Sequence, residues 1–252
     1  MMNEVIIHID QLAKKYKDAD YYAVQALDLT IQKNEIFGML GPNGAGKTTL
    51  ISMLCGLLKP TSGSFEIDQL NYKKNRKQIQ YLIGVVPQEY ALYPTLTAYE
   101  NLMYFGSMYG IKTDDLKKRI DKSLSELGLT KFSNKRINTF SGGMKRRVNL
   151  IAGILHQPKI LFLDEPTVGV DVQSKNVIIQ HLKQLNEKGT TIVYTSHHMI
   201  EAQELCTEVA IIDHGKIVVK GAPNDLIKSV KNAINLEDVY LDLTGGELRD
   251  YA

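Results

Sequence analysis

The amino-terminal part of the chain alternates between apolar and polar positions. Val5, Ile7 and Ile9 are apolar at every second position. The same spacing recurs from Ala26 to Ile31, and Ser64–Ile67 has a similar pattern. Because successive side chains of a strand point to opposite faces of a sheet, this period predicts half-buried strands. We therefore expect an antiparallel β subdomain in this region.

Between Thr95 and Leu129 the apolar residues change to helical spacing. They recur so as to form one apolar stripe, as on the buried face of an amphipathic helix. Gly128 follows as a helix stop signal. The stripe consists of Leu96, Leu102, Phe105, Leu116, Ile120, Leu124 and Leu127. This segment predicts a compact helical insert.

After Ser141 the pattern alternates between short apolar runs and helical segments. We expect strands at Ile160–Leu163, Thr190–Thr195 and Val209–Asp213, and helices at Ser174–Lys188 and Ile200–Cys206. Such alternation is typical of a parallel sheet joined by right-handed crossovers. The whole chain is therefore predicted to be an α/β protein with a mainly parallel sheet, an antiparallel β subdomain and a helical insert.

The residues from Gly41 to Thr48 match the phosphate-loop pattern G-x-x-x-x-G-K-[ST] at every fixed position. The apolar run Ile36–Leu40 predicts a buried strand before the loop, and Thr49–Leu54 continues after it with helical character. The glycines let the backbone wrap around phosphates, with N–H groups pointing inward at the positive end of the helix dipole. The candidate nucleotide-binding residues are Gly41, Pro42, Asn43, Gly44, Ala45, Gly46, Lys47, Thr48 and Thr49. We expect this chain to bind a nucleoside triphosphate.

Within this loop, Lys47 can reach the β- and γ-phosphates, and the Thr48 hydroxyl can ligate Mg²⁺. A second group of chemical residues lies where the apolar run Ile160–Leu163 ends in Asp164 and Glu165. These acids emerge at the carboxyl edge of the sheet, where α/β proteins bind ligands. We predict that Asp164 holds Mg²⁺ and that Glu165 polarises the water that attacks the γ-phosphate.

Charge and hydropathy exclude several classes of protein. With 30 basic and 28 acidic residues among 252, the chain has no electrostatic footprint for nucleic acid, and Lys73–Lys77 fits a solvated face. Nowhere do the ~18 consecutive apolar residues of a membrane span occur. The first residues, Met1–Val5, lack the basic-then-apolar pattern of a secretion signal. We therefore expect a soluble, cytoplasmic chain.

The segment Phe140–Arg147 resembles the signature motif L-S-G-G-Q of the ATP-binding cassette (ABC) family. Three further motifs stand along the chain in the family's order, one before this segment and two after it. Gln88 resembles the Q-loop glutamine, Val170-Asp171 resembles the D-loop, and His197 resembles the switch histidine. The resemblance runs from about Val5 to Gly221 and implies the ABC ATPase fold on a P-loop NTPase core.

Two positions of the signature segment depart from the family pattern. Phe140 stands in place of the usual Leu and Met144 in place of the usual Gln. The central Ser141, Gly142 and Gly143 are intact, and their hydroxyl and backbone amides suit an anion site at a helix amino end. We expect the binding chemistry to be kept.

Two assignments within the resemblance have more than one candidate. Tyr16 occupies the place of the aromatic residue that stacks on adenine in this family, and Tyr21 and Tyr22 are weaker candidates. His198 stands next to His197, and the family spacing selects His197, which directly follows the Thr-Ser pair.

The resemblance implies a mechanism in which two cassettes face each other head to tail. Each ATP lies between the phosphate loop of one copy and Ser141, Gly142 and Gly143 of the other. The implied catalytic residues are Lys47, Gln88, Glu165 and His197. Asp171 joins the nucleotide-binding set, and the implied Mg²⁺ ligands are Thr48, Gln88 and Asp164.

The compact insert resembles that of transporter cassettes. Glu89–Asn101 and the tail Asn235–Gly245 resemble the type-2 exporter branch, although the tail also fits a plain amphipathic helix. The resemblance implies an ATP-hydrolysing subunit that drives a separate membrane permease from the inner face of the cell membrane. The alternative is a non-transport ATPase of a soluble assembly, such as an iron–sulfur scaffold or a translation factor. We assign residues 1–221 to the ATPase domain, with its insert at about 89–140, and residues 222–252 to a carboxyl-terminal extension.

The insert also carries more aromatic and flexible apolar residues than its short helices need. Such groups are enriched at protein interfaces. The set is Tyr90, Leu92, Tyr93, Leu96, Tyr99, Met103, Tyr104 and Tyr109. Part of it is expected to form the socket for the membrane subunit, and the alternative is that all of it packs inward as core.

Overall fold

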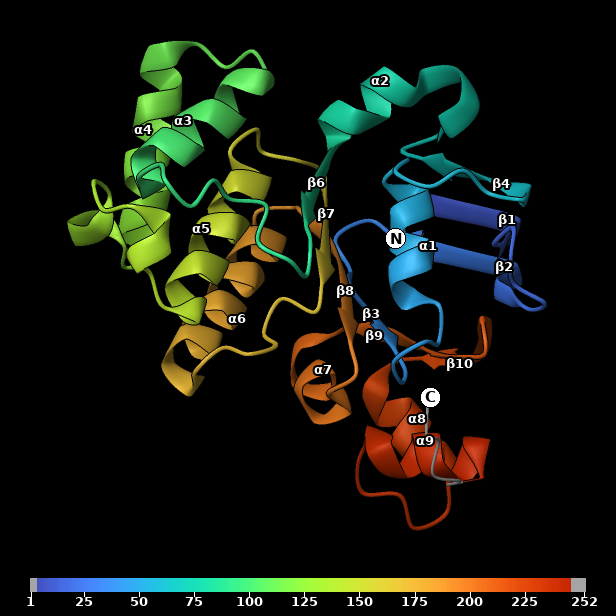
Figure 1. Ribbon diagram of the computed structural model, residues 1–252. Helices are drawn as coiled ribbons and strands as arrows, with labels where there is room; N and C mark the ends of the chain where they lie inside the picture. The colour runs from blue at the N-terminus through green and yellow to red at the C-terminus, as the bar shows by residue number, and fades with distance from the viewer. Residues whose placement is uncertain (1–3, 246–252) are drawn as a thin grey trace. The chain divides into compact units, whose positions relative to one another are not determined.

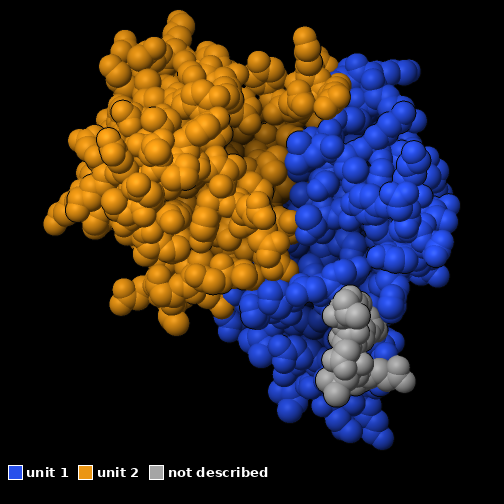
Figure 2. All heavy atoms as spheres, viewed as in Figure 1, with its two compact units in different colours: residues 1–75, 193–252 blue, residues 76–192 orange. Residues whose placement is uncertain are grey.

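The computed structural model describes residues 4–245, and their contacts divide the chain into two units (Figures 1 and 2). Unit 1 combines residues 1–75 with 193–252, and unit 2 comprises residues 76–192. Two elements cross this division: α2 (Tyr72–Leu82), which is kinked at Asn75, and β8 (Thr191–Ser196). Two segments lie outside the described residues: residues 1–3, where no secretion signal was predicted, and residues 246–252 of the predicted extension.

Unit 1 contains a four-stranded antiparallel sheet with the order β2-β1-β4-β5. The strands are β1 (Val5–Lys15), β2 (Tyr22–Gln32), β4 (Ser62–Ile67) and β5 (Leu70–Asn71). Ile7 and Ile9 are buried as the alternation predicts, whereas Val5 is exposed at the start of β1. The predicted antiparallel β subdomain is confirmed.

Unit 1 also holds the strands that flank the phosphate loop. They are β3 (Ile36–Leu40), β9 (Glu208–Asp213) and β10 (Lys216–Gly221). β3 pairs with β9 in parallel, and β10 pairs with β9 as an antiparallel edge strand. All five residues of β3 are buried, as expected for a strand covered on both faces.

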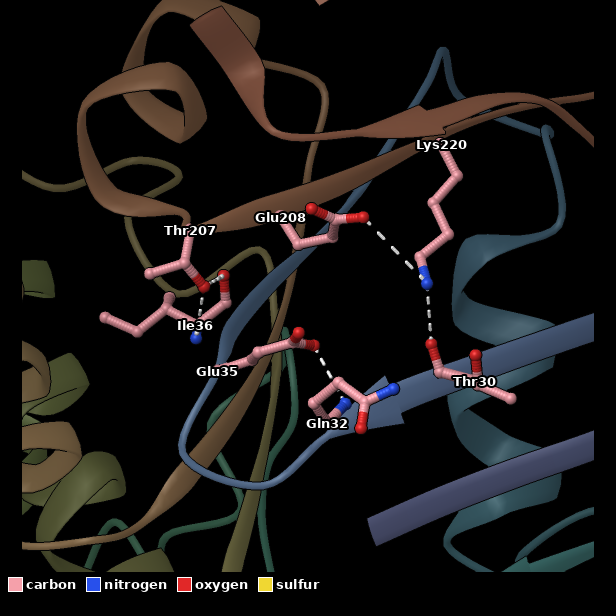
Figure 3. Close-up of polar contacts among 7 residues, drawn as sticks. All are labelled: Thr30, Gln32, Glu35, Ile36, Thr207, Glu208 and Lys220. Atoms are coloured by element: carbon pink, nitrogen blue, oxygen red, sulfur yellow. Dashed lines mark hydrogen bonds and ion pairs between the residues drawn. The ribbon is translucent and has the colours of Figure 1, made fainter. Parts of the chain in front are cut away.

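Polar contacts join these strands to the first sheet (Figure 3). On β10, the ammonium of Lys220 lies 3.9 Å from the carboxylate of Glu208 on β9 and donates to the Thr30 carbonyl of β2 across 2.9 Å. Partial burial raises the pKa of Glu208, and the nearby Lys220 opposes this effect. The Thr207 hydroxyl lies 3.1 Å from the amide nitrogen and 3.2 Å from the carbonyl oxygen of Ile36. These bonds fix the beginning of β3, and therefore the strand that leads into the phosphate loop.

The helices of unit 1 are α1 (Lys47–Leu54), α7 (Met199–Leu205), α8 (Pro223–Ser229) and α9 (Leu236–Thr244). The tail is helical from Leu236, and Asn235 forms a capping box with Asp238 at its start. The Leu236 amide donates to the Gln203 side chain of α7 across 3.1 Å, which ties α9 to α7.

Unit 2 consists of two parallel strands and a group of helices (Figure 1). Its strands are β6 (Ile83–Val86) and β7 (Ile160–Asp164), and its α-helices are α3 (Ala98–Met108), α4 (Thr113–Glu126), α5 (Gly142–Ile154) and α6 (Val172–Glu187). Two short 3-10 helices span Thr130–Phe132 and Ile137–Thr139. α5 contacts β6, α3, α4 and α6, so the signature helix is central to this unit. The predicted α/β class, with parallel strand pairs, an antiparallel sheet and a helical insert, is confirmed.

The predicted helical insert contains the two helices α3 and α4. A capping box starts α3: the Glu100 amide donates to the Thr97 hydroxyl (3.1 Å), and the Thr97 amide donates to the Glu100 carboxylate (2.7 Å). α3 ends where the amides of Tyr109 and Gly110 turn back to carbonyls of its last turn. Sequence periodicity missed β6, α2 and the edge strand β10, because their apolar runs are short. Within residues 4–245, every helix is too short or too polar to cross a bilayer.

Candidate nucleotide-binding and catalytic site

The phosphate loop in unit 1 has a backbone that requires glycine. It connects β3 to α1, and Gly41 has a φ of 152° and Gly46 a φ of 104°. A Cβ on Gly41 would lie 2.1 Å from the Ile212 carbonyl oxygen, and one on Gly46 would lie 2.2 Å from the Ala23 carbonyl oxygen. Both positions are therefore closed to larger residues, and the predicted strand-loop-helix order is present.

The loop has the chemistry to hold a polyphosphate. Among the described residues, no side chain caps the first turn of α1, whose amino end begins at Gly46. Its N–H groups and helix dipole suit a bound anion. Lys47 is buried, and its ammonium donates to the carbonyls of Gly41 (2.8 Å) and Pro42 (2.9 Å) across the loop. The Lys47 ammonium therefore lies across the loop in which it was predicted to contact the phosphates.

Of the three candidate adenine-stacking tyrosines, Tyr16 makes a side-chain contact with the phosphate-loop helix. Its hydroxyl is 3.3 Å from that of Thr49, in the first turn of α1, and the Lys14 ammonium lies 5.4 Å from the ring centre. Tyr22 instead faces Lys15 at 5.8 Å, and Tyr21 is 72% exposed. The position of Tyr16 fits the stacking role predicted for it.

The two candidate switch histidines follow β8 and belong to unit 1. Their ring centres are 4.1 Å apart, with His197 half-buried and His198 exposed. The His198 amide donates to the Ser196 hydroxyl across 2.9 Å, which shapes the turn after the strand. The two histidines therefore differ in exposure, and His197 is the more buried of the two.

In unit 2, the parallel pairing of β6 and β7 brings the Q-loop glutamine to the predicted catalytic acid. Val86 is in register with Leu163, so the segments after both strands start from the same edge. There the Gln88 side-chain amide donates to the Glu165 carboxylate across 3.2 Å. The structure thus joins two residues that were predicted independently as catalytic.

The two acids after β7 are held in different ways. Asp164 is the last residue of the strand, and Glu165 follows it with a φ of 47°, in the left-handed region that non-glycine residues rarely occupy. Both residues are only 6% exposed. Backbone strain of this kind costs about 1–3 kcal/mol and concentrates at functional sites. The turn directs Glu165 away from the strand and towards Gln88.

The signature segment starts α5 as predicted, with Ser141 as its N-cap. The Ser141 hydroxyl accepts from the Met144 amide across 3.3 Å. Gly143 lies against the start of α6, where a Cβ would come within 2.3 Å of the Ser174 hydroxyl and 2.7 Å of the Asp171 carboxylate. Asp171 caps α6 by accepting from the Ser174 amide (2.9 Å), and this bonding lowers the pKa of Asp171. The D-loop aspartate and the signature glycine are therefore neighbours.

The departures from the signature pattern are accommodated by packing. Phe140 is buried in the insert, edge-on to Phe132 with ring centres 6.3 Å apart. Met144 lines a surface hollow together with these two rings. Neither change alters the N-cap at Ser141.

Sequence reasoning missed Arg146, Asn149 and the role of Tyr90. All three contact the Q-loop segment or the signature helix, as described below. A signal was present, because Arg146 stands three positions after Gly143 and shares its buried helix face. The sequence analysis included Arg146 in the signature segment but assigned it no role.

The predicted site residues thus form two sets. The phosphate loop, Tyr16 and His197 belong to unit 1, whereas Gln88, Asp164, Glu165, the signature residues and Asp171 belong to unit 2. Within each set the side chains make the contacts described above. Among the described residues, no group of three or more His, Cys, Asp or Glu gathers as a metal site. The predicted Mg²⁺ ligands, Thr48, Gln88 and Asp164, all offer oxygen, which suits a hard cation that keeps phosphate and water ligands.

Comparison with known proteins agrees with these features. The sequence profile described as ABC transporter matches residues 24–168. The linearmycin resistance ATP-binding protein LnrL of Bacillus subtilis (strain 168) is 49% identical over 203 residues, which is 81% of this chain and 65% of LnrL. The ABC transporter ATP-binding protein NatA of the same organism is 38% identical over 83% of this chain and 86% of NatA. The Nod factor export ATP-binding protein I of Cupriavidus metallidurans is 37% identical over 94% of this chain and 77% of its own length.

Solved structures give the same result. The ATP-binding cassette MJ0796, in a dimeric post-hydrolysis state bound to ADP and Pi, superposes with a TM-score of 0.79 at 28% identity, covering 86% of this chain and 98% of that one. An ATP-binding subunit of an ABC transporter reaches a TM-score of 0.86 at 24% identity over 95% of this chain and 99% of its own, which shows the shared fold. The chain therefore belongs to the ABC transporter family, as an ATP-binding ATPase subunit of the type-2 branch that its motifs resemble.

Proposed function

We propose that the chain binds ATP with Mg²⁺, dimerises around it, and hydrolyses it to drive export through a separate membrane permease. The observation that carries the catalytic part is the contact between Gln88 and Glu165 at the end of a buried strand, with Glu165 in a strained turn. A buried carboxylate held by an amide donor is suited to orient and polarise a water molecule.

In this proposal the residues of unit 1 bind the nucleotide. The amides from Gly41 to Thr48 hold the phosphates, Lys47 moves from the loop carbonyls to the β- and γ-phosphates, and Tyr16 stacks on the base. Thr48 of unit 1, and Gln88 and Asp164 of unit 2, are the oxygen donors that would hold Mg²⁺, which would neutralise charge on the phosphates. Glu165 orients the attacking water, and His197 acts as the switch histidine.

Dimerisation follows from the signature segment. Ser141, Gly142 and Gly143 lie at the amino end of α5, where the Ser141 hydroxyl and the backbone amides suit the γ-phosphate held by a second copy. ATP then favours the closed dimer only while the γ-phosphate bridges both copies, so hydrolysis loosens it. The dimeric state of MJ0796 with ADP and Pi supports this arrangement.

Relatives support a transport role and its direction. LnrL is a resistance protein and the Nod factor protein is an export protein by name. The neighbour cbiO1 is described as part of the transporter complex cbiONQ, with a TM-score of 0.79 at 26% identity over 95% of this chain and 99% of that one. These names support our proposal that the chain works at the inner face of the cell membrane, bound to a permease. The division into a cassette of residues 1–221 and an extension of 222–252 remains part of the proposal.

The direct test is to co-express the chain with a membrane protein of about six apolar segments encoded by a neighbouring gene, and to reconstitute the purified complex in vesicles. An exporter should accumulate substrate in vesicles whose ATPase subunits face outward, and only when ATP and Mg²⁺ are present outside. Co-purification of the chain with soluble proteins only, and with no membrane subunit, would support the soluble alternative. Substrate movement from the lumen to the ATP side would contradict export.

A further inference from the structure

A buried arginine on the signature helix holds the loop that carries Gln88. Arg146 lies in the first part of α5 and is 3% exposed. Its Nη1 donates to the Pro87 carbonyl across 2.9 Å, and its Nη2 donates to the Gln88 carbonyl across 2.8 Å. Because a guanidinium is a rigid planar fork of donors, two bonds to successive carbonyls fix both the position and the orientation of the loop.

Two further side chains strengthen this attachment. The ring of Tyr90 lies 4.9 Å from the Arg146 guanidinium carbon, and the Tyr90 hydroxyl donates to the carbonyl of the signature residue Gly142 across 3.3 Å. Asn149, less than one turn beyond Arg146, donates to the Pro87 carbonyl (3.2 Å) and accepts from the Ala91 amide (3.4 Å). The loop is therefore bound along its length to one helix.

The helix itself has a fixed place beside the loop. α5 packs on β6, the strand that leads into the loop, and the approach is close because Gly84 has no side chain. A Cβ there would lie 2.2 Å from the Gly153 carbonyl of α5. The strand, the helix and Arg146 together set where Pro87 and Gln88 begin.

We propose that Arg146 is a positioning residue for hydrolysis, which holds the backbone of Gln88 so that its side-chain amide stays on Glu165. This inference rests on the proposed role of Glu165 as the water-orienting carboxylate. Arg146 acts through the backbone carbonyl of the same residue whose side chain touches Glu165, so displacement of that carbonyl displaces the amide. No part of this chain of contacts involves the phosphate loop.

The electrostatics favour positioning over stabilisation. Burial lowers the pKa of Arg146, while the nearby Tyr90, Asp164 and Glu165 raise it, and an arginine remains charged under all these influences. Its buried Nε–H has no hydrogen-bond partner among the described residues. A buried charge with an unmet donor is costly, so the same volume could be filled more favourably by an apolar residue.

The test compares Arg146→Met with the control Arg119→Met in the full purified chain. Arg119 also donates to a backbone carbonyl in unit 2, but to that of Leu155 across 2.8 Å rather than to the Q-loop segment. We expect Arg146→Met to lower kcat for ATP hydrolysis by about tenfold or more, as for a small displacement of a catalytic group. ATP affinity and KM should stay near wild type, and Arg119→Met should retain both kcat and KM.

A double-mutant cycle shows whether the effect passes through Gln88. If it does, Arg146→Met should have little effect on kcat when Gln88→Ala is already present, because the amide it positions is gone. Arg146→Lys keeps the charge but loses the paired donors, and should recover only part of kcat. If Arg146→Met does not fold, Arg146→Lys and Tyr90→Phe in the same cycle carry the test.

Three results would overturn the inference. They are a kcat loss no larger than that of Arg119→Met, a loss that is equally large in the Gln88→Ala background, and a raised KM with normal kcat. The proposed function is tested separately by Glu165→Gln. If Glu165→Gln stops ATP turnover but the Arg146 variants turn over ATP at the wild-type rate, the positioning role of Arg146 is wrong and the catalytic role of Glu165 stands. If Glu165→Gln turns over normally, the proposed function itself fails.

Discussion

The side-chain amide of Gln88 donates a hydrogen bond to the carboxylate of Glu165 across 3.2 Å, although the two residues are 77 positions apart in the chain. They meet because β6 and β7 pair in parallel and end at the same edge. One residue comes from the loop before the helical insert, and the other follows the buried strand after it. A displacement of the insert-side loop therefore reaches the acid through a single hydrogen bond.

The first prediction concerns that acid. Glu165→Gln should keep ATP binding but slow hydrolysis by ~100-fold or more, because the amide cannot polarise water as the carboxylate does. Phosphate release measures the rate, and gel filtration with ATP should show an accumulated dimer. Glu126→Gln, at an exposed position of α4, is the matched control and should turn over normally. A monomer with unchanged turnover would contradict the role assigned to Glu165.

The phosphate loop makes a different prediction. Lys47→Ala should abolish measurable ATP binding, because the ammonium that crosses the loop to Gly41 and Pro42 is lost together with its attraction for phosphate. Equilibrium binding of a fluorescent ATP analogue is the measurement. Lys33→Ala, an exposed lysine of the same unit, should bind normally. Unaltered affinity in Lys47→Ala would show that this loop does not hold the nucleotide.

Base recognition is tested at Tyr16. Tyr16→Ala should weaken ATP and GTP binding alike by ~1–2 kcal/mol, because stacking uses the ring face and reads little of the base edge. Tyr16→Phe should bind nearly as wild type, since it loses only the contact with Thr49. Tyr22→Ala is the comparison variant. If it loses more nucleotide affinity than Tyr16→Ala, Tyr22 is the residue that stacks on the base. A strong change in ATP-over-GTP preference would place the base contact elsewhere.

The aromatic and apolar set of the insert contains buried, half-buried and exposed members. Leu92 is buried, whereas Tyr93 and Tyr104 are 45% and 41% exposed and lie edge-on to each other at 5.1 Å. Tyr90 instead contacts Arg146, so a charged residue there would disturb the Q-loop as well. The surface pair is therefore the sharper probe of the predicted socket.

Tyr93→Glu and Tyr104→Glu should leave ATP binding and basal hydrolysis by the isolated chain near normal, yet weaken co-purification with the membrane subunit and abolish transport. Charged residues are disfavoured in the core of a protein interface, which is why we expect binding of the membrane subunit to be lost. Thermal unfolding of both variants provides the control for folding. Full transport with either variant, or unfolding of both, would show that these tyrosines do not form a socket.

Stability should depend on pH through His156. Its Nε2 lies 2.9 Å from the Ile83 carbonyl and must donate to it, its Nδ1 has no partner among the described residues, and its ring stacks on Tyr109. Burial lowers the pKa of His156 below its ordinary 6.5. In the acid range the unfolded chain then binds more protons than the folded chain. The contribution of His156 to the free energy of unfolding is therefore fully present above about pH 6.5, and it is lost as the pH falls towards the folded-state pKa.

Urea unfolding at a series of pH values measures this dependence. His156→Phe keeps a ring against Tyr109 but cannot titrate, so its unfolding free energy should fall less between pH 7 and acid than that of the wild type. Each variant is referred to its own value at pH 8, which removes the cost of the lost bond to Ile83. Parallel pH curves for the two proteins would show that His156 does not contribute.

The features that the sequence by itself determined are those carried by neighbouring residues. The phosphate loop is recognised from Gly41 to Thr48 because its glycines, lysine and threonine act within one turn. The strand ending in Asp164 is recognised because its apolar run and its acids are contiguous. For the same reason Ser141 was correctly placed at a helix start, where its hydroxyl caps its own helix.

Only the tertiary structure decided which of these pieces touch. The contact of Gln88 with Glu165 depends on the register of β6 against β7, and the sequence missed β6. The burial of Arg146 depends on the close packing of α5 on that strand, which local composition cannot reveal. The division of the insert's tyrosines into half-buried and exposed members likewise depends on how α3 lies against its neighbours. Strand register and helix packing are set by many distant side chains acting together, so no local pattern encodes them.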